Sequence, residues 1–450
     1  MRIAIVDLPV TDGDHAITAQ NLNSGMVTPC CVIQGRTSLR GDIAISGSKN
    51  AALPILAATL LTDQPCVLHN VPELTDVANM LEALRLLGAE VISVGPRSWS
   101  ICAKDVHTDA RNPVVQHLRA SVCLLGALLG RKRSASVAMP GGCKLGARPI
   151  DLHLRAFHRL GAQVHQPTGY VSLQTDYLTG TVLSMLGPRG PSMTGTSNAV
   201  MAAVLAKGTT VIRHASREPE IASLCRMLNQ MGARITGLNS GTLIVKGVPF
   251  LHGTSFTVPP DRIEAGTFII LGYLRGTPVR VHGLTPQFLT ENFQGFFDAI
   301  PSARRHSFFH DGAFEVHRIE DLPGLDICTL PYPGFPTDLQ PQISVLASQA
   351  ISASRVRDTV FPQRFAHIPA FRRLGIQAKV EHDTLHLAPH STLHSGEVTA
   401  TDLRAGAALY LAGILADGST TVFRPDYVDR GYEHFEEKLQ KLGAELTRLS

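Results

Sequence analysis

The hydrophobic pattern of the chain repeats with a period of about 70 residues, which is the length of one supersecondary unit. The repeated phrase has leucine or methionine, then glycine, then alanine or isoleucine, and it stands between a helical pattern and a strand pattern. A glycine in that place commonly ends a helix in the left-handed conformation. The glycines are Gly88, Gly161, Gly232, Gly375 and Gly443. Because one interval is about twice the others, we expect a copy that has lost its glycine near residues 298–301.

Each unit also contains a short helix that is apolar on nearly every side, such as residues 51–58. A helix of that kind is buried all round, whereas the second helix of a unit is amphipathic, as in residues 73–87 and 431–442. Runs such as residues 67–71 and 209–212 predict strands. We expect the buried helices to begin at or near Lys49, Arg119, Asn198, Arg262, Asp338 and Arg404.

Together these patterns predict a mixed α/β fold of six β/α units, three in each of two similar domains. Each unit has one helix inside and one outside. The polar turn at residues 256–261 is the candidate crossover between the domains, and the first strand is expected at residues 41–46. Residues 1–25 match neither repeated phrase, so we expect an extension there without regular structure.

Composition narrows the class of protein. The chain has 450 residues, 44% of them apolar and 17% charged, so it can bury large cores and is not disordered in bulk. Its net charge of +4 is too balanced for a general nucleic-acid binder. The longest apolar runs are shorter than the roughly 20 residues of a membrane span, and the N-terminus lacks a signal-peptide pattern. We therefore expect a soluble, cytoplasmic protein.

The cysteines and histidines indicate neither a disulfide framework nor a metal site. The 8 cysteines are irregularly spaced, and the 19 histidines include no HExxH motif. We expect no metal and no cofactor.

Basic residues stand at or near the predicted N-terminal ends of four buried helices: Lys49, Arg119, Arg262 and Arg404. Such an end already carries a partial positive charge, so a cation there is unfavourable unless an anion joins it. Helix N-termini bind anions readily. For any single site, pairing with a carboxylate such as Asp402 or Glu264 is an open alternative. For the whole set, anion binding is the favoured hypothesis.

A glycine-rich stretch over residues 140–149 holds one thiol, Cys143, close to two cations, of which Arg148 is one. Neighbouring cations lower the pKa of a thiol, so a nucleophile or proton donor is favoured over a core cysteine. The stretch lacks the Gly-Lys-Ser/Thr ending of a P-loop. By contrast, Cys123 and Cys225 lie on helical runs and are expected to pack in the core.

Asp338 stands directly before a predicted buried helix. A carboxylate there caps the helix or, close to bound anions, acts as a general base, and the sequence leaves both interpretations open. Arg364 follows a strand-like run and Arg430 precedes a helix, which adds two cations to the candidate set.

Five motifs together resemble a known family. They cover residues 46–54, 140–152, 335–338, 402–405 and 429–433. They look like UDP-N-acetylglucosamine 1-carboxyvinyltransferase, the enolpyruvyl transferase that opens peptidoglycan precursor synthesis. The similarity runs from about residue 30 to the C-terminus.

The resemblance implies an EPSP synthase-like enolpyruvyl transferase fold, made of two inside-out α/β domains of three repeated β/α units each. It implies a first, discontinuous domain of residues 26–48 plus 260–450, and a second domain of residues 49–259 that carries the Cys143 loop. The active site would lie in the cleft between them. The implied substrates are phosphoenolpyruvate and UDP-N-acetylglucosamine, and we expect a monomer without nucleic-acid or membrane partners.

Carried over residue by residue, the resemblance assigns four catalytic positions, Cys143, Asp338, Lys49 and Arg430. Cys143 would protonate the enol carbon or form a phospholactoyl adduct, and fosfomycin would alkylate it. Asp338 would take the proton of the sugar 3-hydroxyl. The residues implied to hold phosphoenolpyruvate are Lys49, Arg119, Arg148, Arg364, Arg404 and Arg430. The residues implied to hold the UDP-sugar are Asn50, Arg119, Arg148, Pro149, Ile150, Asp151, Leu152, Ser192, Asp338 and Val360.

One stretch, residues 189–196, departs from the family pattern, because Gly190 stands where the family has a lysine. That segment contacts the nucleotide sugar in the family. Another uridine nucleotide as acceptor therefore stays open, as does a catalytically idle relative that binds nucleotide sugars. The shikimate-pathway transferase is disfavoured, since its Lys-Ser-x-Thr-x-Arg motif is absent at Lys49 to Pro54. The balanced charge disfavours a nucleic-acid end-processing enzyme.

Overall fold

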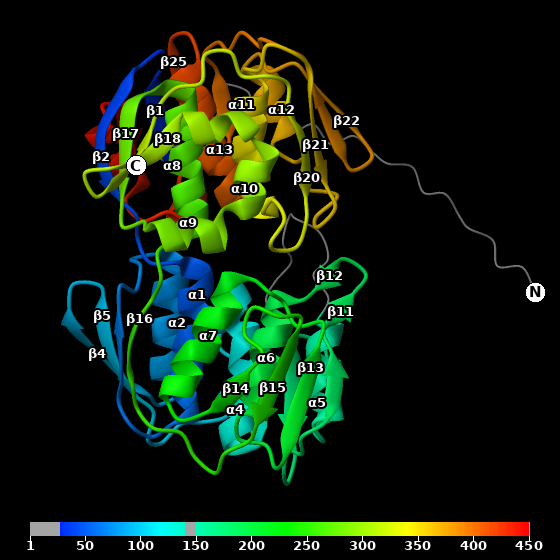
Figure 1. Cartoon of the computed structure of the whole chain (residues 1–450). Helices are drawn as coiled ribbons and strands as arrows, with labels where there is room; N and C mark the ends of the chain where they lie inside the picture. Colours follow the sequence, from blue (N-terminus) through cyan, green and yellow to red (C-terminus); the bar gives the residue numbers. More distant parts are fainter. Residues whose placement is uncertain (1–27, 140–149, 450) are drawn as a thin grey trace, which may run out of the picture.

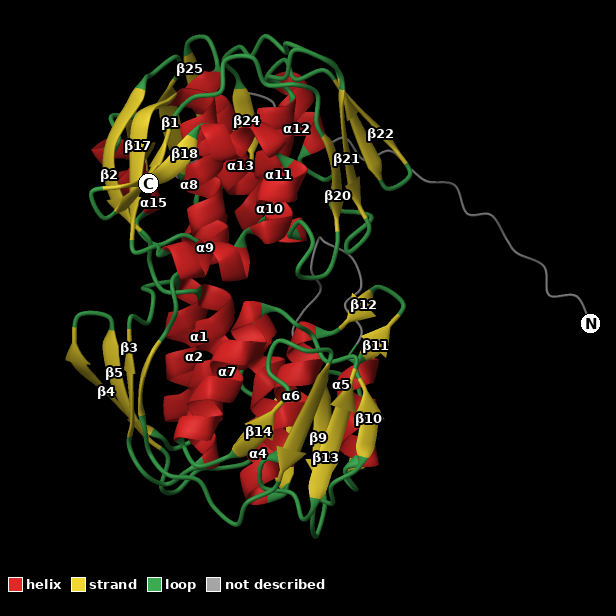
Figure 2. Ribbon diagram, viewed as in Figure 1, coloured by secondary structure: helices red, strands yellow, loops and turns green. Residues whose placement is uncertain are grey.

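The structure of the protein, a computed structural model, describes residues 28–139 and 150–449. It consists of two lobes, one above the other in Figure 1, and the chain crosses between them at one side. Each lobe has its own hydrophobic core. The core of the lower lobe lies within residues 51–258, and that of the upper lobe combines residues 31–45 with residues 263–446. Helices occupy the middle of each lobe and sheets lie outside them (Figure 2).

The α-helices follow the order of the chain through the two lobes. Those of the lower lobe are α1 (Lys49–Ala58), α2 (Thr75–Leu86), α3 (Pro113–His117), α4 (Cys123–Lys132), α5 (Asp151–Arg159), α6 (Met193–Ala203) and α7 (Pro219–Gln230). Those of the upper lobe are α8 (Arg262–Arg275), α9 (Pro286–Asn292), α10 (Gln294–Ala299), α11 (Gln340–Ala347), α12 (Ile368–Arg373), α13 (Leu403–Leu415), α14 (Asp426–Asp429) and α15 (Phe435–Lys441).

Within the described residues, six four-stranded sheets share one topology, in which a parallel pair is followed by two antiparallel pairs. In the lower lobe the orders are β16 (Ser255–Thr257), β3 (Cys66–His69), β5 (Ser98–Cys102), β4 (Glu90–Gly95); then β6 (Asp109–Ala110), β7 (Ser134–Ala138), β9 (Tyr170–Gln174), β8 (Gln163–His165); then β10 (Val182–Ser184), β13 (Thr209–Arg213), β15 (Thr242–Lys246), β14 (Arg234–Thr236). In the upper lobe they are β2 (Leu39–Ala44), β17 (Gly276–His282), β19 (Ala313–Val316), β18 (Ser307–His310); then β20 (Asp326–Thr329), β21 (Ser354–Asp358), β23 (Thr384–Leu387), β22 (Ala378–Glu381); then β24 (Glu397–Thr399), β25 (Ser419–Phe423), β1 (Cys30–Gln34), β26 (Leu446–Leu449). One sheet for each predicted repeat confirms the six units.

Three of these sheets are completed by strands from distant parts of the chain, one of them by β2, which runs parallel to β17. Strand β16 runs parallel to β3, with Phe256 opposite Leu68. Strand β1 pairs antiparallel with both β25 and β26, and its Ile33 lies opposite Thr420 and Leu446. The predicted strand at residues 41–46 corresponds to β2, but the prediction that it is the first strand is wrong, because β1 precedes it. A strand whose partners lie almost at the other end of the chain leaves no local hairpin signal.

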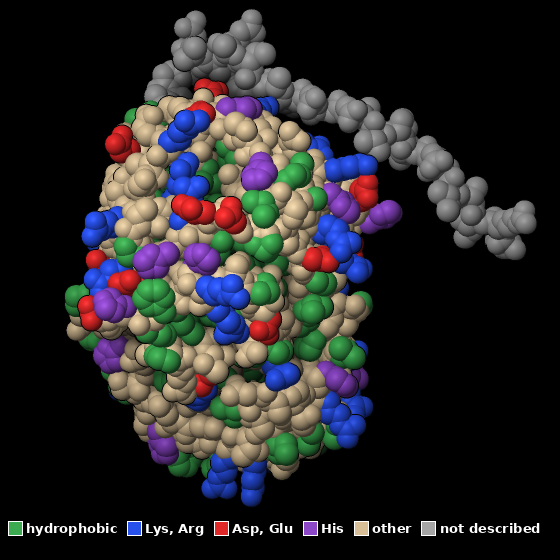
Figure 3. Space-filling view, turned by 45° about the horizontal axis from the view of Figure 1, so that its top comes forward, with side chains coloured by type: hydrophobic (Ala, Val, Ile, Leu, Met, Phe, Trp, Pro, Cys, Tyr) green, Lys and Arg blue, Asp and Glu red, His purple; other side chains and the backbone are tan. Residues whose placement is uncertain are grey.

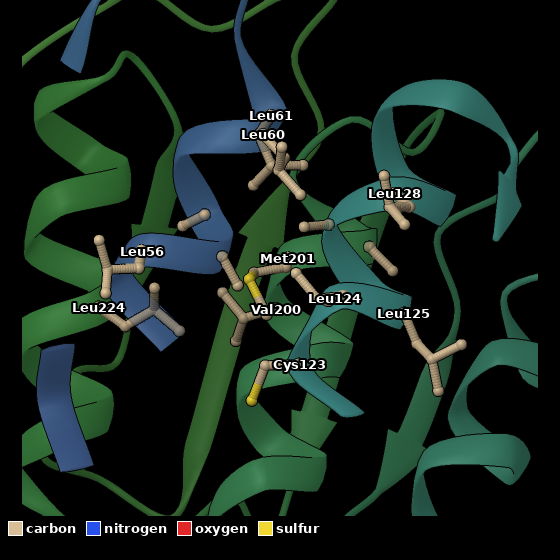
Figure 4. Close-up of a cluster of buried hydrophobic side chains, with 14 of the residues drawn as sticks. Leu56, Leu60, Leu61, Cys123, Leu124, Leu125, Leu128, Val200, Met201 and Leu224 are labelled. Carbon is tan, nitrogen blue, oxygen red and sulfur yellow. The ribbon is translucent and has the colours of Figure 1, made fainter. Parts of the chain in front are cut away.

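The inner helices form the centre of each core. Helices α1, α4 and α6 pack on one another in the lower lobe, and α8, α11 and α13 do so in the upper lobe. In Figure 4, Met201 of α6 and Leu124 of α4 lie beside each other in the middle of the cluster, and Leu56 of α1 lies beside Leu224 of α7. Cys123 lies in this cluster, Cys225 of α7 is also buried, and burial raises the pKa of each thiol to about 12. The prediction that both cysteines are core residues is confirmed.

One predicted helix start is wrong. Helix α6 begins at Met193, so Asn198 lies inside it. The Asn198 side chain accepts a hydrogen bond from the Gly126 amide at 2.8 Å and donates to the Val122 carbonyl at 2.8 Å. A Cβ at Gly126 would lie 2.5 Å from the Asn198 carbonyl oxygen. The polar residue is thus a cross-link between two closely packed helices, not a helix start.

The repeated glycines adopt the expected backbone. Their φ angles are +94° at Gly88, +103° at Gly161, +99° at Gly232, +92° at Gly375 and +95° at Gly443. In the irregular fourth unit, α10 ends at Ala299 and a 3-10 turn, Pro301–Arg305, follows. The copy without a glycine is therefore confirmed at its expected place.

The two crossings between the lobes lie side by side. The Ser48 amide donates to the Pro259 carbonyl at 2.7 Å, and the Asp261 amide donates to the Ser46 carbonyl at 2.8 Å. Gly47 and Pro260 form an antiparallel bridge between them. The polar turn at residues 256–261 is thus a crossover. In the part of the chain that the structure describes, every helix is too short or too polar to span a bilayer.

Candidate active site

The facing ends of the two lobes carry the N-termini of inner helices. Ser48 caps α1 by accepting from the Ala51 amide, and Asp402 caps α13 by accepting from the Arg404 amide at 2.8 Å. Asp261 caps α8 and also accepts the Lys49 amide at 3.1 Å, so it joins two helices across the crossover. These caps hold Lys49 and Arg404 at fixed positions on opposite lobes.

The first ionic group joins the lobes. The Lys49 ammonium lies 2.6 Å from one oxygen of Asp76, and the Arg430 Nε lies 3.0 Å from the other. Asp76 is 4% exposed. Burial alone would raise the pKa of Asp76, but the charges of Lys49 and Arg430 bring it below its usual value. Burial lowers the pKa of Lys49, and the charges of Arg404 and Arg430 also lower it, whereas Asp76 acts in the opposite direction.

The second ionic group lies in the upper lobe. Asp338 binds the Arg364 guanidinium at 2.8 Å and the Arg404 guanidinium at 3.1 Å. Arg364 is 2% exposed and Arg404 1%. Arg364 also donates to the Thr337 hydroxyl at 2.9 Å, and that hydroxyl donates to Asp358 at 2.7 Å. The interpretation of Asp338 as a helix cap is wrong, because Asp338 lies inside the 3-10 turn Thr337–Leu339 and the following helix α11 has no side-chain cap.

The two groups adjoin, since the charge of Arg404 reaches Lys49. We call Lys49, Arg364, Arg404 and Arg430 the four-cation cluster. Its four positive charges face two carboxylates, Asp76 and Asp338. Among the ion pairs of the described residues, each of the two carboxylates is thus shared by two cations, and the charge of Asp261 also acts on Arg404. A group of fixed cations of this kind suits a dianionic phosphate.

The alternative of carboxylate pairing is correct for each of the three cations whose side chains the structure describes, since Lys49 pairs with Asp76 and Arg404 with Asp338. Arg262 binds Glu218 at 2.6 Å and Glu220 at 3.0 Å, both in the lower lobe, so two carboxylates neutralise it. The partners expected from the sequence were different. Asp402 is a helix cap, and Glu264 binds Lys438. Arg262 is therefore an inter-lobe ion pair and not part of the cluster.

The expected UDP-sugar residues lie on two facing surfaces. In the lower lobe, Leu152 follows the first residue of α5 and lies against the hairpin of β11 (Leu186–Gly187) and β12 (Gly190–Pro191). A Cβ at Gly187 would lie 3.1 Å from Leu152 Cδ1. Ser192 follows the hairpin directly and caps α6, accepting from the Gly195 amide at 3.1 Å.

Other members of this set complete the two surfaces. Asn50 is the one residue of α1 that is not buried, and Ile150 precedes α5. Asp151 is exposed at the start of α5. On the upper lobe, the Val360 amide donates to Asp358 at 3.1 Å, in a turn beyond the end of β21.

At Gly190 this hairpin of the lower lobe comes close to the upper lobe. The φ of Gly190 is +93°, and a Cβ there would lie 2.8 Å from Pro331 Cγ of the upper lobe. A side chain at position 190 is therefore excluded by the backbone and by its neighbour.

Four of the predicted site residues lie wholly or partly outside the part of the chain that the structure describes. Cys143, Arg148 and Pro149 lie outside the described residues. The backbone of Arg119 opens a 3-10 turn, Arg119–Val122, ahead of α4, and its side chain lies outside the description.

Comparison with known proteins agrees with this architecture. A family model described as EPSP synthase (3-phosphoshikimate 1-carboxyvinyltransferase) matches residues 33–439. The chain belongs to the EPSP synthase family. A relative in Akkermansia muciniphila, named UDP-N-acetylglucosamine 1-carboxyvinyltransferase, is 41% identical over 93% of this chain and 98% of its own length. A relative in Carboxydothermus hydrogenoformans, named UDP-N-acetylglucosamine 1-carboxyvinyltransferase 2, is 43% identical over 93% and 99%.

Solved structures share the fold of this EPSP synthase family member. The enolpyruvyl transferase NikO from Streptomyces tendae superposes with a TM-score of 0.85 at 24% identity, covering 94% of this chain and 99% of its own. EPSP synthase from Acinetobacter baumannii gives a TM-score of 0.70 at 16% identity, covering 94% and 100%. The predicted EPSP synthase-like fold is confirmed.

Asp76 belongs to the candidate site of this protein, but it was not predicted from the sequence. It lies in the first turn of α2 and shares the buried face of that helix with Met80 and Leu84. A carboxylate on the apolar face of an amphipathic helix was the available signal, because a buried charge requires a partner.

The surface of this family member shows dispersed charge. On the face drawn in Figure 3, Lys and Arg side chains are interspersed with Asp, Glu and His. Four histidines stand at four-residue spacing from His382 to His394, but they do not share a helix face, because His386 lies in β23 and the others lie in the turn before it and the loop after it. Within residues 28–139 and 150–449, no group of His, Cys, Asp and Glu side chains is arranged to hold a metal ion.

Proposed function

We propose that this protein transfers the enolpyruvyl group of phosphoenolpyruvate to the 3-hydroxyl of UDP-N-acetylglucosamine and releases phosphate. This is the first committed step of peptidoglycan precursor synthesis. The observation that carries the proposal is the four-cation cluster, in which cations from both lobes converge around Asp76 and Asp338. The names of relatives at about 40% identity over nearly the whole chain support the acceptor.

The reaction needs three kinds of group. The oxygen of the sugar 3-hydroxyl bonds to the phosphate-bearing carbon of phosphoenolpyruvate, and Asp338 accepts the proton of that hydroxyl. The Cys143 thiol donates a proton to the methylene carbon. The carbon–oxygen bond to phosphate then breaks, and the same methyl group loses a proton to restore the double bond. General acid–base catalysis and fixed cations suit these steps.

Substrate binding is divided between the two lobes. We assign phosphoenolpyruvate to the four-cation cluster together with Arg119 and Arg148. We assign the UDP-sugar to Asn50, Arg119, Arg148, Pro149, Ile150, Asp151, Leu152, Ser192, Asp338 and Val360. In this proposal residues 26–48 plus 260–450 form one domain, residues 49–259 form the other, and residues 1–25 are an extension. The enzyme acts in the cytoplasm, as a monomer, without a metal or cofactor.

Phosphate release tests the proposed reaction. Mixing the protein with phosphoenolpyruvate and UDP-N-acetylglucosamine should release phosphate, and neither substrate alone should do so. Release with UMP but not with the UDP-sugar would support the alternative acceptor. Tight binding of the UDP-sugar without any phosphate release would support the catalytically idle relative.

Variants of Cys143 test the loop thiol. Cys143→Ser should keep the fold and lose most of the activity, because a hydroxyl is a far weaker acid than a thiol next to cations. Cys143→Asp should keep activity, since an aspartic acid also donates a proton, and should escape fosfomycin. Activity in the presence and absence of fosfomycin, with thermal melting of each variant, gives the measurement. Continued inhibition of Cys143→Asp would remove Cys143 as the alkylated residue.

A further inference from the structure

A closed triangle of polar side chains lies in the core of the upper lobe. The Gln342 amide donates to the Tyr432 hydroxyl at 2.7 Å and to the Thr267 hydroxyl at 3.2 Å. The two hydroxyls are 3.1 Å apart. Thr267 and Gln342 are 0% exposed and Tyr432 is 2% exposed. Polar groups buried this deeply are unfavourable unless paired, so the triangle holds its three members in one arrangement.

The triangle brings together separate elements. Thr267 lies on α8, Gln342 on α11, and Tyr432 in the segment between α14 and α15. Its hydrogen bonds therefore fix the Tyr432 ring relative to two of the three inner helices of the lobe.

The face of that ring contacts the four-cation cluster. The Arg404 guanidinium carbon, on the third inner helix α13, lies 5.2 Å from the centre of the Tyr432 ring. A guanidinium at this distance is held by cation–π attraction. Arg404 Nη2 binds Asp338, whereas its buried Nη1 has no hydrogen-bond partner within the described part of the chain. The ring thus orients a guanidinium that keeps one nitrogen available for a ligand.

The residues next to Tyr432 in the chain contact the other lobe. Arg430 binds Asp76 at 3.0 Å, and Glu433 accepts the Glu73 amide at 2.6 Å. Between them, Gly431 lies close against the Leu403 side chain at the start of α13, so a Cβ there would displace that side chain. The position of Tyr432 therefore determines where Arg430 stands.

We propose that Tyr432 is a positioning residue for the phosphate-binding end of the site, orienting Arg404 through its ring and Arg430 through the chain, with Thr267 and Gln342 fixing its hydroxyl. This inference rests on the proposed function only in that the bound anion is phosphoenolpyruvate.

Tyr432→Phe keeps the ring and removes the hydroxyl that anchors it. We expect the KM for phosphoenolpyruvate to rise about 3- to 10-fold, the range of one net hydrogen bond, with the KM for UDP-N-acetylglucosamine unchanged. Thr267→Val should shift the same KM in the same direction. In the double variant the two effects should be less than additive, because both remove one network.

Tyr410→Phe is the matched control. Tyr410 is equally buried in the same lobe, and its hydroxyl donates to Glu436 at 2.7 Å, away from the four-cation cluster. It should lose thermal stability as Tyr432→Phe does, but leave both KM values unchanged. Equal KM shifts in the two variants, or an unchanged KM for phosphoenolpyruvate in Tyr432→Phe, would overturn the positioning role.

Calorimetric binding of phosphoenolpyruvate to the full chain separates this inference from the proposed reaction. If the parent binds phosphoenolpyruvate but does not use UDP-N-acetylglucosamine, the proposed acceptor is wrong, and weaker binding to Tyr432→Phe still supports the positioning role. If the variant binds as tightly as the parent, the positioning role is wrong whichever acceptor is used. If the parent binds neither phosphoenolpyruvate nor inorganic phosphate, both proposals fail.

Discussion

Asp338→Asn should lower kcat by about 10²- to 10⁴-fold, the usual contribution of a positioned general base. The amide has nearly the same shape but cannot take up the proton of the acceptor hydroxyl. Binding of both substrates should persist, since the four-cation cluster is intact. Steady-state phosphate release together with calorimetric binding of each substrate measures the two effects separately.

The same substitution should also destabilise the protein in a way that an anion can reverse. Asp338 lies between two buried guanidiniums, so its neutralisation should lower the free energy of unfolding by about 1–3 kcal/mol. Inorganic phosphate should restore part of the loss by binding the folded state. Asp326→Asn, which breaks an exposed pair with Arg355, is the matched control and should change neither kcat nor phosphate sensitivity. Unchanged kcat in Asp338→Asn would exclude the proposed base.

Local features of the fold could be predicted from the sequence because their causes are local. A glycine such as Gly88 ends a helix by its own conformational freedom, and an all-apolar run such as residues 51–58 must be buried wherever the chain goes. The period of these signals was enough to predict six units. Strand β1 could not be predicted in the same way, because its partners β25 and β26 are separated from it by most of the chain.

The sequence predicted a set of cations for the site, but it could not predict which side chains each of them contacts. The helix N-termini indicated Lys49 and Arg404, and nothing in the sequence distinguished them from Arg262. Only folding shows that Arg262 meets Glu218 and Glu220 across the lobes. Asp338 was open between cap and base for the same reason, since its contacts with Arg364 and Arg404 depend on three separate elements.

The ion pairs also explain how so much buried charge is tolerated. Each buried cation of the cluster has a carboxylate within 3.1 Å, as the pairs of Asp76 and Asp338 show. Because both carboxylates are shared by two cations, no cation of the cluster is unpaired. The shared carboxylates thus hold the cations close together before any anion binds.

The second large effect is expected at Lys49. Lys49→Met should lower kcat/KM for phosphoenolpyruvate by about 10²- to 10³-fold, comparable to the loss of one preorganised donor at a developing charge. It also leaves Asp76 with Arg430 alone, so some stability is lost. Lys438→Met is the control, because Lys438 is another buried lysine, paired with Glu264. It should lower the melting temperature while the folded protein keeps its kcat/KM for phosphoenolpyruvate.

The pH dependence of Lys49 provides the sharper test. Burial lowers the pKa of this ammonium, with Arg404 and Arg430 adding to the effect, so its charge is lost on the alkaline side before that of an ordinary lysine. Binding of an anion needs the charged form, and kcat/KM for phosphoenolpyruvate should therefore fall as pH rises toward 10.5, the ordinary value. Lys49→Arg stays charged throughout this range. It should have a lower kcat/KM at neutral pH, because the larger, planar guanidinium cannot keep the position of the ammonium, yet lack the Lys49-dependent alkaline decline. An identical decline in the parent and in Lys49→Arg would assign that decline to another group and remove the ammonium of Lys49 from phosphoenolpyruvate binding.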